Sequence, residues 1–342
     1  MANRSTNTGK GLNARIDGRL LNYARNTFVR GGGANSGPNI PPFTATGGTK
    51  SGPTGGYFFH YFTTPGPQPF TANYPIPGAR FILVAGGGSG AGGYGGGGGG
   101  GGVVYSNGTY TIESGDWTVE IGAGGPAPII GYTDGAPGGN SNFYKSGASY
   151  PSPTYLRAFG GGGGSGGAGY IPGGSGGGGG VAGPSTATQP SANPGVSGIT
   201  NAGSAGGKAP SNNPGYAHGG GGGAGEVGES TSSATTSGRG GSGLGPPTWT
   251  WLPTSFGYNG YFAGGGGGSG YSNNATPANG LGSPDGTGGR AYRTTATPGE
   301  PGRANTGGGG GAASTPNPGI PYNTSGGGGG SGAMIIAYPD TL

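Results

Sequence analysis

The chain has 342 residues, of which 99 are Gly and 31 are Pro, far above the roughly 7% and 5% of ordinary globular proteins. It contains no Cys and only two His, which excludes disulfides and Cys-based zinc or iron–sulfur sites and leaves almost no material for a histidine metal cluster or a Ser-His-Asp triad. Charged residues make up 7% of the chain and the formal net charge is +5, so charge repulsion does not keep the chain open.

Residues 1–30 carry the whole net charge, because six basic residues there are opposed by one acid, Asp17. An apolar residue recurs every four positions from Leu12 to Phe28, which favours one short α-helix over residues 9–30; a hairpin turn at Asp17-Gly18 is the alternative. We interpret residues 1–30 as a basic attachment arm, and a solvated basic tail is the simpler alternative. The residues expected to make the attachment are Arg15, Arg19, Leu20, Arg25 and Phe28.

Residues 31–56 are rich in Gly, Pro, Ser, Thr and Asn and are interpreted as a linker. The segments predicted to be strands are 57–63 (YFFHYFT), 79–85 (ARFILVA), 103–112 (VVYSNGTYTI), 116–121 (DWTVEI) and 333–338 (AMIIAY). Asn107-Gly108 predicts a hairpin turn inside the third of them. Because the first and last strands can pair only if the two ends meet, residues 57–342 are expected to form one closed domain.

Glycine tracts occupy much of the chain between these strands. They cover residues 86–102, 160–167, 173–180, 219–225, 264–270, 307–311 and 326–332, and the heptad GGGGGSG occurs three times. Collagen is excluded, because its Gly falls at every third position and these runs are continuous. A flexible linker is the ordinary interpretation of one such tract, but seven tracts between strands point to a structural use.

We expect the tracts to form a bundle of polyglycine II helices, with short flanking β-strands and loops at the bundle ends. An extended left-handed chain of this type has three residues per turn and no internal hydrogen bonds, so its N–H and C=O groups point outward to neighbouring chains. Only Gly permits such close packing. The fold class is therefore mostly irregular and β, with at most one short N-terminal helix, since Gly and Pro disfavour helices.

The long spacers 184–218, 226–262 and 271–306 are expected to be loops at the ends of the bundle, where sequence can vary. One part, residues 248–262 (TWTWLPTSFGYNGYF), is rich in aromatic rings. Exposed rings bind sugars or protein pockets, whereas a local apolar cluster that folds the loop is the alternative. The residues expected to contact a receptor or partner are Trp249, Trp251, Phe256, Tyr258 and Tyr261.

The sequence offers little chemistry for an enzyme. Gly207-Lys208 lacks the Ser or Thr and the first Gly of a phosphate-binding loop, and the acids are scattered, with Glu226 and Glu229 three apart. A single Arg-Gly-Gly, at residues 239–241, and a neutral glycine-rich part argue against nucleic-acid binding. No run of about 18 apolar residues spans a membrane, and residues 1–30 hold no secretory signal. We expect no catalysis, no cofactor and no metal.

Three blocks resemble a family of glycine-rich domains common in tail-fibre and other virion proteins of phages. They are residues 69–104 (PFTANYPIPGARFILVAGGGSGAGGYGGGGGGGGVV), 110–125 (YTIESGDWTVEIGAGG) and 326–339 (GGGGGSGAMIIAYP). A related polyglycine-helix core occurs in the tail-fibre tip adhesin of T-even-like phages and in the glycine-rich domain of anaplastic lymphoma kinase. The kinase version is typically secreted and has Cys, which this chain lacks.

The resemblance implies a non-enzymatic structural protein at the virion surface, a tail-fibre or adhesin component whose loops recognise the host. Its partners are expected to be other virion proteins, through the N-terminal arm, and a host surface glycan or protein, with assembly as a homo-oligomer on the particle. A capsid decoration protein anchored by the arm is one alternative. An extracellular filament or wall protein is the other.

Overall fold

A computed structural model describes residues 42–341, apart from positions 94, 130 and 132 and segments 168–170, 180–191, 210–216, 232–235, 271–279, 293–296 and 314–323. The chain divides into two units, Met1–Phe43 and Thr44–Leu342, and the second holds all the described strands. The expected N-terminal helix and the whole attachment arm, with Arg15, Arg19, Leu20, Arg25 and Phe28, lie outside the described residues.

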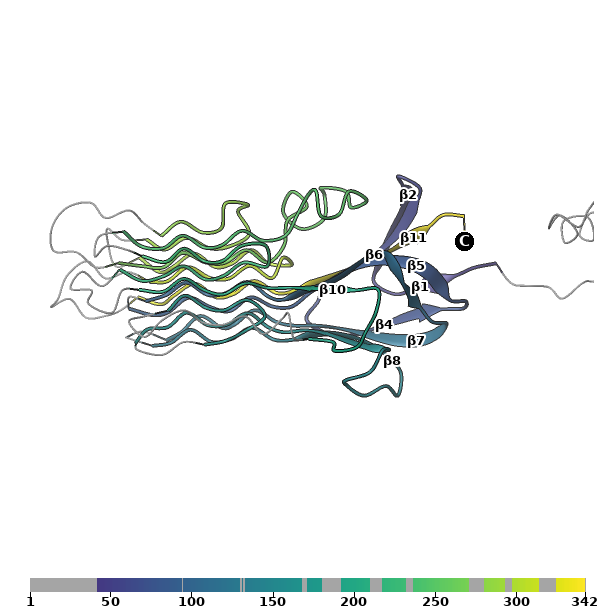
Figure 1. Ribbon diagram of the computed structural model, residues 1–342, viewed down its shortest axis with the longest axis horizontal. Coiled ribbons are helices and arrows are strands. Elements are labelled where there is room, and N and C mark those ends of the chain that lie inside the picture. Colours follow the sequence, from purple (N-terminus) through teal and green to yellow (C-terminus); the bar gives the residue numbers. More distant parts are fainter. Residues whose placement is uncertain are drawn as a thin grey trace, which may run out of the picture. The chain divides into compact units, whose positions relative to one another are not determined.

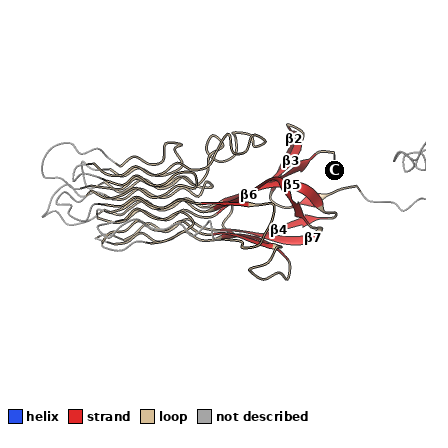
Figure 2. Cartoon of the chain, viewed as in Figure 1, coloured by secondary structure: helices blue, strands red, loops and turns tan. Residues whose placement is uncertain are grey.

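The described residues contain eleven strands and no helix (Figures 1 and 2), so the fold is mostly β and irregular, as expected. The strands are β1 (Ala45–Thr46), β2 (Thr49–Thr54), β3 (Tyr57–Phe62), β4 (Gly66–Ala72), β5 (Ile76–Val84), β6 (Val103–Ile112), β7 (Gly115–Ile121), β8 (Ser141–Lys145), β9 (Tyr155–Ala158), β10 (Thr200–Ala202) and β11 (Ala333–Pro339). They form two antiparallel sheets, sheet A in the order β1-β4-β7-β8-β9 and sheet B in the order β10-β6-β5-β11-β3-β2.

All five predicted strand segments are strands in the structure. The first and last of them, β3 and β11, pair with each other, which confirms that the ends of the domain meet. The linker prediction is wrong for residues 45–54, because β1 and β2 lie there and pair with β4 and β3. The second unit therefore begins at Thr44 rather than at Tyr57.

The hairpin predicted at Asn107-Gly108 is wrong, because β6 runs through these residues as one strand. Its pairing with β5 shifts between Arg80 and Ala79, so residues 108 and 109 form a bulge, and Gly108 takes a φ of 106° that favours Gly. The Ser106 hydroxyl accepts the N–H groups of Gly108, Thr109 and Tyr110 and so holds the bulge.

An aromatic core lies between the two sheets. The Phe70 ring of β4 contacts His60 and Phe62 of β3 edge-on, at centroid distances of 5.4 and 6.3 Å. Phe143 of β8 stacks on Trp117 at 4.5 Å. All of these side chains are buried. The alternation of buried and outward residues along β4 and β7 leaves one face of sheet A toward solvent.

His60 is a fully buried titratable group within this core. Its Nδ1 lies 2.6 Å from the Gly47 carbonyl oxygen and its Nε2 lies 3.1 Å from the Tyr338 hydroxyl. With the proton on Nδ1, the ring donates to Gly47 and accepts from Tyr338. Burial lowers the pKa of His60 below 6.5, opposed by the Gly47 hydrogen bond and aided by the nearby charge of Lys50.

Lowering the pH from 7.5 through 6.5 is expected to reduce the free energy of unfolding. The unfolded chain takes up the His60 proton at a higher pH than the folded chain does, so stability falls until the folded His60 is protonated as well. Denaturant unfolding curves across this range measure the effect. In His60→Gln the loss should be smaller than in the wild type, and an equal loss would place its source elsewhere.

The glycine tracts continue directly from the strands and run away from the two sheets (Figure 2). Val84 of β5 pairs with Val103 of β6. Beyond them Ala85 donates to the Gly102 carbonyl, Gly88 to Gly99 and Ala91 to Gly96. The period of the ladder thereby changes from two residues in the sheet to three in the tract. The β5–β6 pair is in effect one long hairpin whose far half is glycine.

Candidate functional site: a glycine bundle and its aromatic segment

Residues 96–102 lie inside the bundle and donate to a different neighbour at each successive position. The N–H groups of Gly96 and Gly99 bind carbonyl oxygens in the 159–165 tract, at 2.9 and 2.7 Å. Those of Gly97 and Gly100 bind the 219–222 segment, at 3.2 and 2.9 Å. Those of Gly98 and Gly101 bind the 307–310 segment, both at 2.8 Å. The donor direction therefore repeats every three residues.

The carbonyl groups of the same tract are used in the same way by three other segments. Gly96 and Gly99 accept from Ala91 and Gly88, Gly97 and Gly100 accept from Gly178 and Ser175, and Gly98 accepts from Gly266. The tract is thus hydrogen bonded to six neighbouring segments. A β-strand, whose hydrogen bonds lie in one plane, has at most two hydrogen-bonded neighbours.

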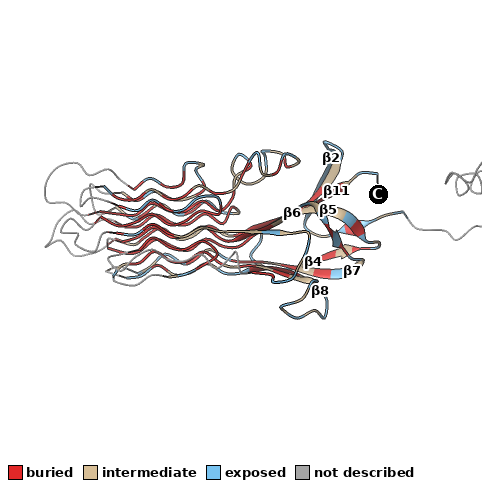
Figure 3. Cartoon of the chain, viewed as in Figure 1, coloured by how far each residue is buried: buried red, intermediate tan, exposed pale blue. Residues whose placement is uncertain are grey.

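Most of the described tract residues are buried (Figure 3), and most of their glycines have no room for a Cβ. A Cβ built on Gly97 would fall within 3.0 Å of the Gly266 backbone, and one on Gly96 would meet the Gly178 backbone in the same way. Atoms of the main chain cannot move aside as the end of a flexible side chain can. Gly is therefore the residue that forms this core, and its peptide groups are satisfied by neighbouring tracts.

The expectation that the long spacers are end loops is wrong for much of their length. They contribute further extended segments, called outer passes below, that run along the bundle and bond to its tracts. Gly238 donates to the His218 carbonyl and Gly241 to that of Gly221, again three residues apart. Side chains on these outer passes also recur at every third residue. Glu226 accepts from the Ser242 hydroxyl at 2.6 Å and lies 3.6 Å from Arg239. These contacts, led by the Ser242 hydrogen bonds, lower the pKa of Glu226.

The aromatic segment 248–262 packs on the face of sheet B that is turned away from sheet A. Trp249 is 1% exposed, lies edge-on to the Tyr105 ring at 5.5 Å, and donates its indole N–H to the Gly260 carbonyl. It belongs to one apolar cluster with Phe59, Ile82 and Ile335, among other residues. Sheet B is therefore covered on both faces, which explains the continuous apolar run of β5.

The other rings predicted in this segment are half-buried and have partners of their own. Trp251 donates its indole N–H to the Asn107 side chain at 2.9 Å. Phe256 lies 5.3 Å from Phe59 and 5.1 Å from Tyr61. Tyr258 carries the Arg303 guanidinium 3.7 Å above its ring. Tyr261 pairs with Tyr258 through both backbone groups.

The structure thus places Trp249 in the apolar cluster on sheet B, with Trp251 and Phe256 packed against it, as a local apolar cluster requires. Tyr258 and Tyr261 pair with each other instead, and Tyr258 lies against Arg303. Trp249 presents no surface to a partner. A receptor role for the four half-exposed rings stays a prediction. The side chain of Asn107 ties the segment to the sheet: it accepts the indole N–H of Trp251 and donates to the Thr248 carbonyl. The sequence did not predict this role. The place of Asn107 beside Gly108 suggested a turn instead.

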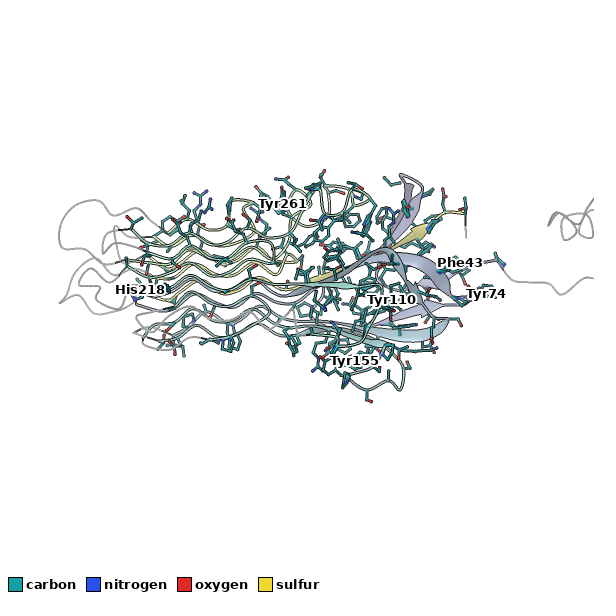
Figure 4. All side chains as sticks on the ribbon, viewed as in Figure 1. Phe43, Tyr74, Tyr110, Tyr155, His218 and Tyr261 are labelled. Atoms are coloured by element: carbon teal, nitrogen blue, oxygen red, sulfur yellow. The ribbon has the colours of Figure 1, made fainter. Side chains whose placement is uncertain are left out.

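The described tracts end together at the side of the bundle remote from the sheets, marked by His218 (Figure 4). There the His218 N–H donates to the Ser269 carbonyl, and Ser269 in turn donates to Gly95. No three His, Cys, Asp or Glu side chains in the described part of the chain are grouped so as to hold a metal ion. None of the described segments forms a helix long and apolar enough to span a bilayer.

The two sheets with their apolar cores, and the glycine bundle that continues from them, define a mostly β and irregular domain. Residues 63–339 match the family model described as a glycine-rich domain. The match covers more than half of the chain, and the chain belongs to this family. No curated protein is significantly similar to it.

Proposed function

We propose that the glycine tracts are polyglycine II helices packed side by side. Three observations support this assignment: the period of three in donors and acceptors, the six hydrogen-bonded neighbours of residues 96–102, and the side chains at every third residue of the outer passes. A left-handed helix with three residues per turn produces each of them. Such a bundle is held by peptide hydrogen bonds, each contributing a net of about 0.5–1.5 kcal/mol.

We propose further that the protein is a non-enzymatic structural protein of a phage particle, an appendage component that presents a surface to the host. The observation that carries this proposal is the construction of the domain. Its bundle has sheets at one end and several tract ends gathered at the other, and its tracts pack too closely for a Cβ at most of their glycines. This is the construction of a rigid spacer. The resemblance of residues 69–104, 110–125 and 326–339 to phage glycine-rich domains supports the particle as its setting.

Location on intact particles tests this function. Antibody-gold labelling and particle imaging are expected to place the protein on a tail appendage, in few copies per particle. Labelling absent from particles altogether would overturn the proposal, and so would recovery of the protein in a cell-wall or filament fraction.

A decoration protein of the capsid is the second candidate, and the charge distribution favours it. The formal charge of +5 resides in residues 1–30 while the remainder is neutral, which suits an arm that docks on an acidic shell surface. Hundreds of copies spread over the shell in the same labelling experiment would support this candidate and exclude the appendage.

A further inference from the structure

The outward face of sheet A carries a pair of stacked tyrosines that the bundle and the core do not use. Tyr144 of β8 and Tyr155 of β9 lie directly opposite each other, with ring centroids 4.7 Å apart and planes 8° from parallel. Tyr150 meets Tyr155 edge-on at 5.7 Å, and the Arg157 guanidinium lies 4.2 Å from the Tyr150 ring. All four side chains are half-buried, and Tyr155 lies at the outer surface of the sheet (Figure 4).

Tyr144 is half-buried, and Tyr155 is the ring that stacks on it among the described residues. Because Tyr144 stacks on Tyr155 of the neighbouring strand β9, the plane of its ring stands perpendicular to the direction from strand to strand. The other face of the ring is therefore turned toward β7, on the far side of β8. The residue opposite it there is Thr118, and beyond Thr118 comes Pro69 of β4. Both side chains are too short to cover a phenol ring. From this register we infer a shelf beside Tyr144, with Thr118 and Pro69 as its floor.

A row of polar side chains, Glu120, Asn142 and Arg157, crosses the strands beside this shelf, two residues from Tyr144 along β8. Asn142 donates to one carboxylate oxygen of Glu120 at 2.8 Å and accepts from Arg157 Nε at 3.0 Å. Asn142 is 7% exposed, so the row is held in place. Among the described residues, these bonds leave the second oxygen of Glu120 without a donor, and the two terminal nitrogens of Arg157, which lie against the Tyr150 ring, without a hydrogen-bond acceptor. Planar acceptors and donors of this kind pair with neighbouring hydroxyls.

The charges of the face disfavour an anionic ligand. Asp116 and Glu120 point outward on β7, against the single guanidinium of Arg157. Nucleic acid and anionic lipid bind basic surfaces, and this one is slightly acidic. An apolar ring with hydroxyls around its edge matches both the shelf and the polar row. A pyranose sugar has this form: its C–H face packs on an aromatic ring and its hydroxyls meet carboxylate, amide and guanidinium groups.

We propose that the outer face of sheet A is a binding site for a neutral glycan, with Tyr144 as the stacking platform and Glu120 and Arg157 as the groups that bind hydroxyls. The site would supply the host-recognition chemistry of the proposed appendage, and its biological use rests on that function. Sugar binding by the purified chain does not depend on where the protein sits on a particle, so the two proposals fail separately.

A printed array of neutral hexose oligosaccharides, with sulfated and sialylated ones beside them, tests the site on the full chain. At least one neutral oligosaccharide is expected to bind. Its affinity, titrated in solution by calorimetry, should fall at least tenfold in Tyr144→Ala and change less than about threefold in Tyr144→Phe, which keeps the ring. Tyr74→Ala, a change in the β4–β5 loop, is the matched control and should bind as the wild type does.

Thr118→Tyr is a second variant that removes no contact and covers the face of Tyr144 turned toward β7 instead. It should abolish binding with an unchanged melting temperature, and it keeps the test decisive if Tyr144→Ala does not fold. Three results would overturn the proposal: no neutral oligosaccharide bound, preference for the anionic ones, or wild-type affinity in Thr118→Tyr. The last would leave the stacked tyrosines as a brace for the β8–β9 hairpin.

Discussion

Replacing Gly329 by Ala is expected to destabilise the domain strongly, whereas the same change at the adjacent Gly328 is expected to be neutral or slightly stabilising. A Cβ on Gly329 would fall within 3.0 Å of the Gly87 backbone, while one on Gly328 would meet nothing closer than 3.4 Å. The two residues share one tract, one amino-acid change and one sequence context. Only the packing of the tract distinguishes them.

The expected loss at Gly329 is about 3 kcal/mol or more, because overpacking against main-chain atoms also breaks hydrogen bonds of the neighbouring tract. At Gly328 the reduced freedom of the unfolded chain is expected to contribute roughly 0.4–1 kcal/mol in the opposite direction. Calorimetric melting and denaturant unfolding of both variants measure the difference. Equal effects at the two positions would mean that the tract is a solvated linker and would sink the bundle proposal.

Trp249→Ala is expected to lower the free energy of unfolding by about 3–5 kcal/mol, the usual cost of removing a large buried ring. The change empties the space between Tyr105 and Phe262 and leaves the Gly260 carbonyl without its indole donor. Thermal melting checks the size of the loss. A loss below about 1 kcal/mol would indicate that the aromatic segment is detached from sheet B in solution.

Trp251→Ala is the matched control within the same segment. It is half-buried, packs against the edge of the cluster and donates to Asn107, so a smaller loss than at Trp249, about 1–2 kcal/mol, is expected. Because this variant keeps the fold, it also separates the two interpretations of the aromatic rings. Reduced adsorption of particles that carry it would support a receptor role for the segment, and unchanged adsorption would leave the rings as a local core.

The sequence predicts the sheets where burial on a strand leaves a periodic pattern. The alternation in residues 116–121 and the apolar run in 79–85 both predict their strands correctly. The same rules miss β2, whose six residues TKSGPT are all exposed and pair only at a sheet edge. Hydrophobic patterns carry no information about an edge strand that buries nothing.

The outer passes of the bundle were missed for a different reason. Their signal is a period of three, with Glu226 and Glu229 on one pass and Arg239 and Ser242 on the next. Helices repeat every 3.6 residues and strands every two, so a search for those periods passes over it. The spacing of the two acids is visible in the sequence, but their partners lie on a segment that only the packed bundle brings near.

The sequence locates the aromatic segment, but it does not decide whether its rings bind a partner or form a local core. Its density of rings is plain in the sequence, yet exposed and packed rings share the same composition. The face of sheet B that Trp249 covers is identified only once β5, β6 and β11 are placed side by side. The sequence does not predict the tyrosine pair on sheet A for a similar reason, since Tyr144 and Tyr155 are 11 positions apart and meet only through strand pairing.

The passage of β5 and β6 into glycine has a further consequence for how the domain chooses its alignment. A glycine tract that is shifted by three residues, one turn, against its neighbours makes equivalent hydrogen bonds. The tracts alone therefore do not specify a single register. The pairing of Val84 with Val103, and of Ala333 with Val84, admits no such slip without turning apolar side chains to the wrong face. The side-chain pairing in the sheets therefore fixes the register of the glycine tracts. It also sets how far the remote end of the bundle lies from the sheets.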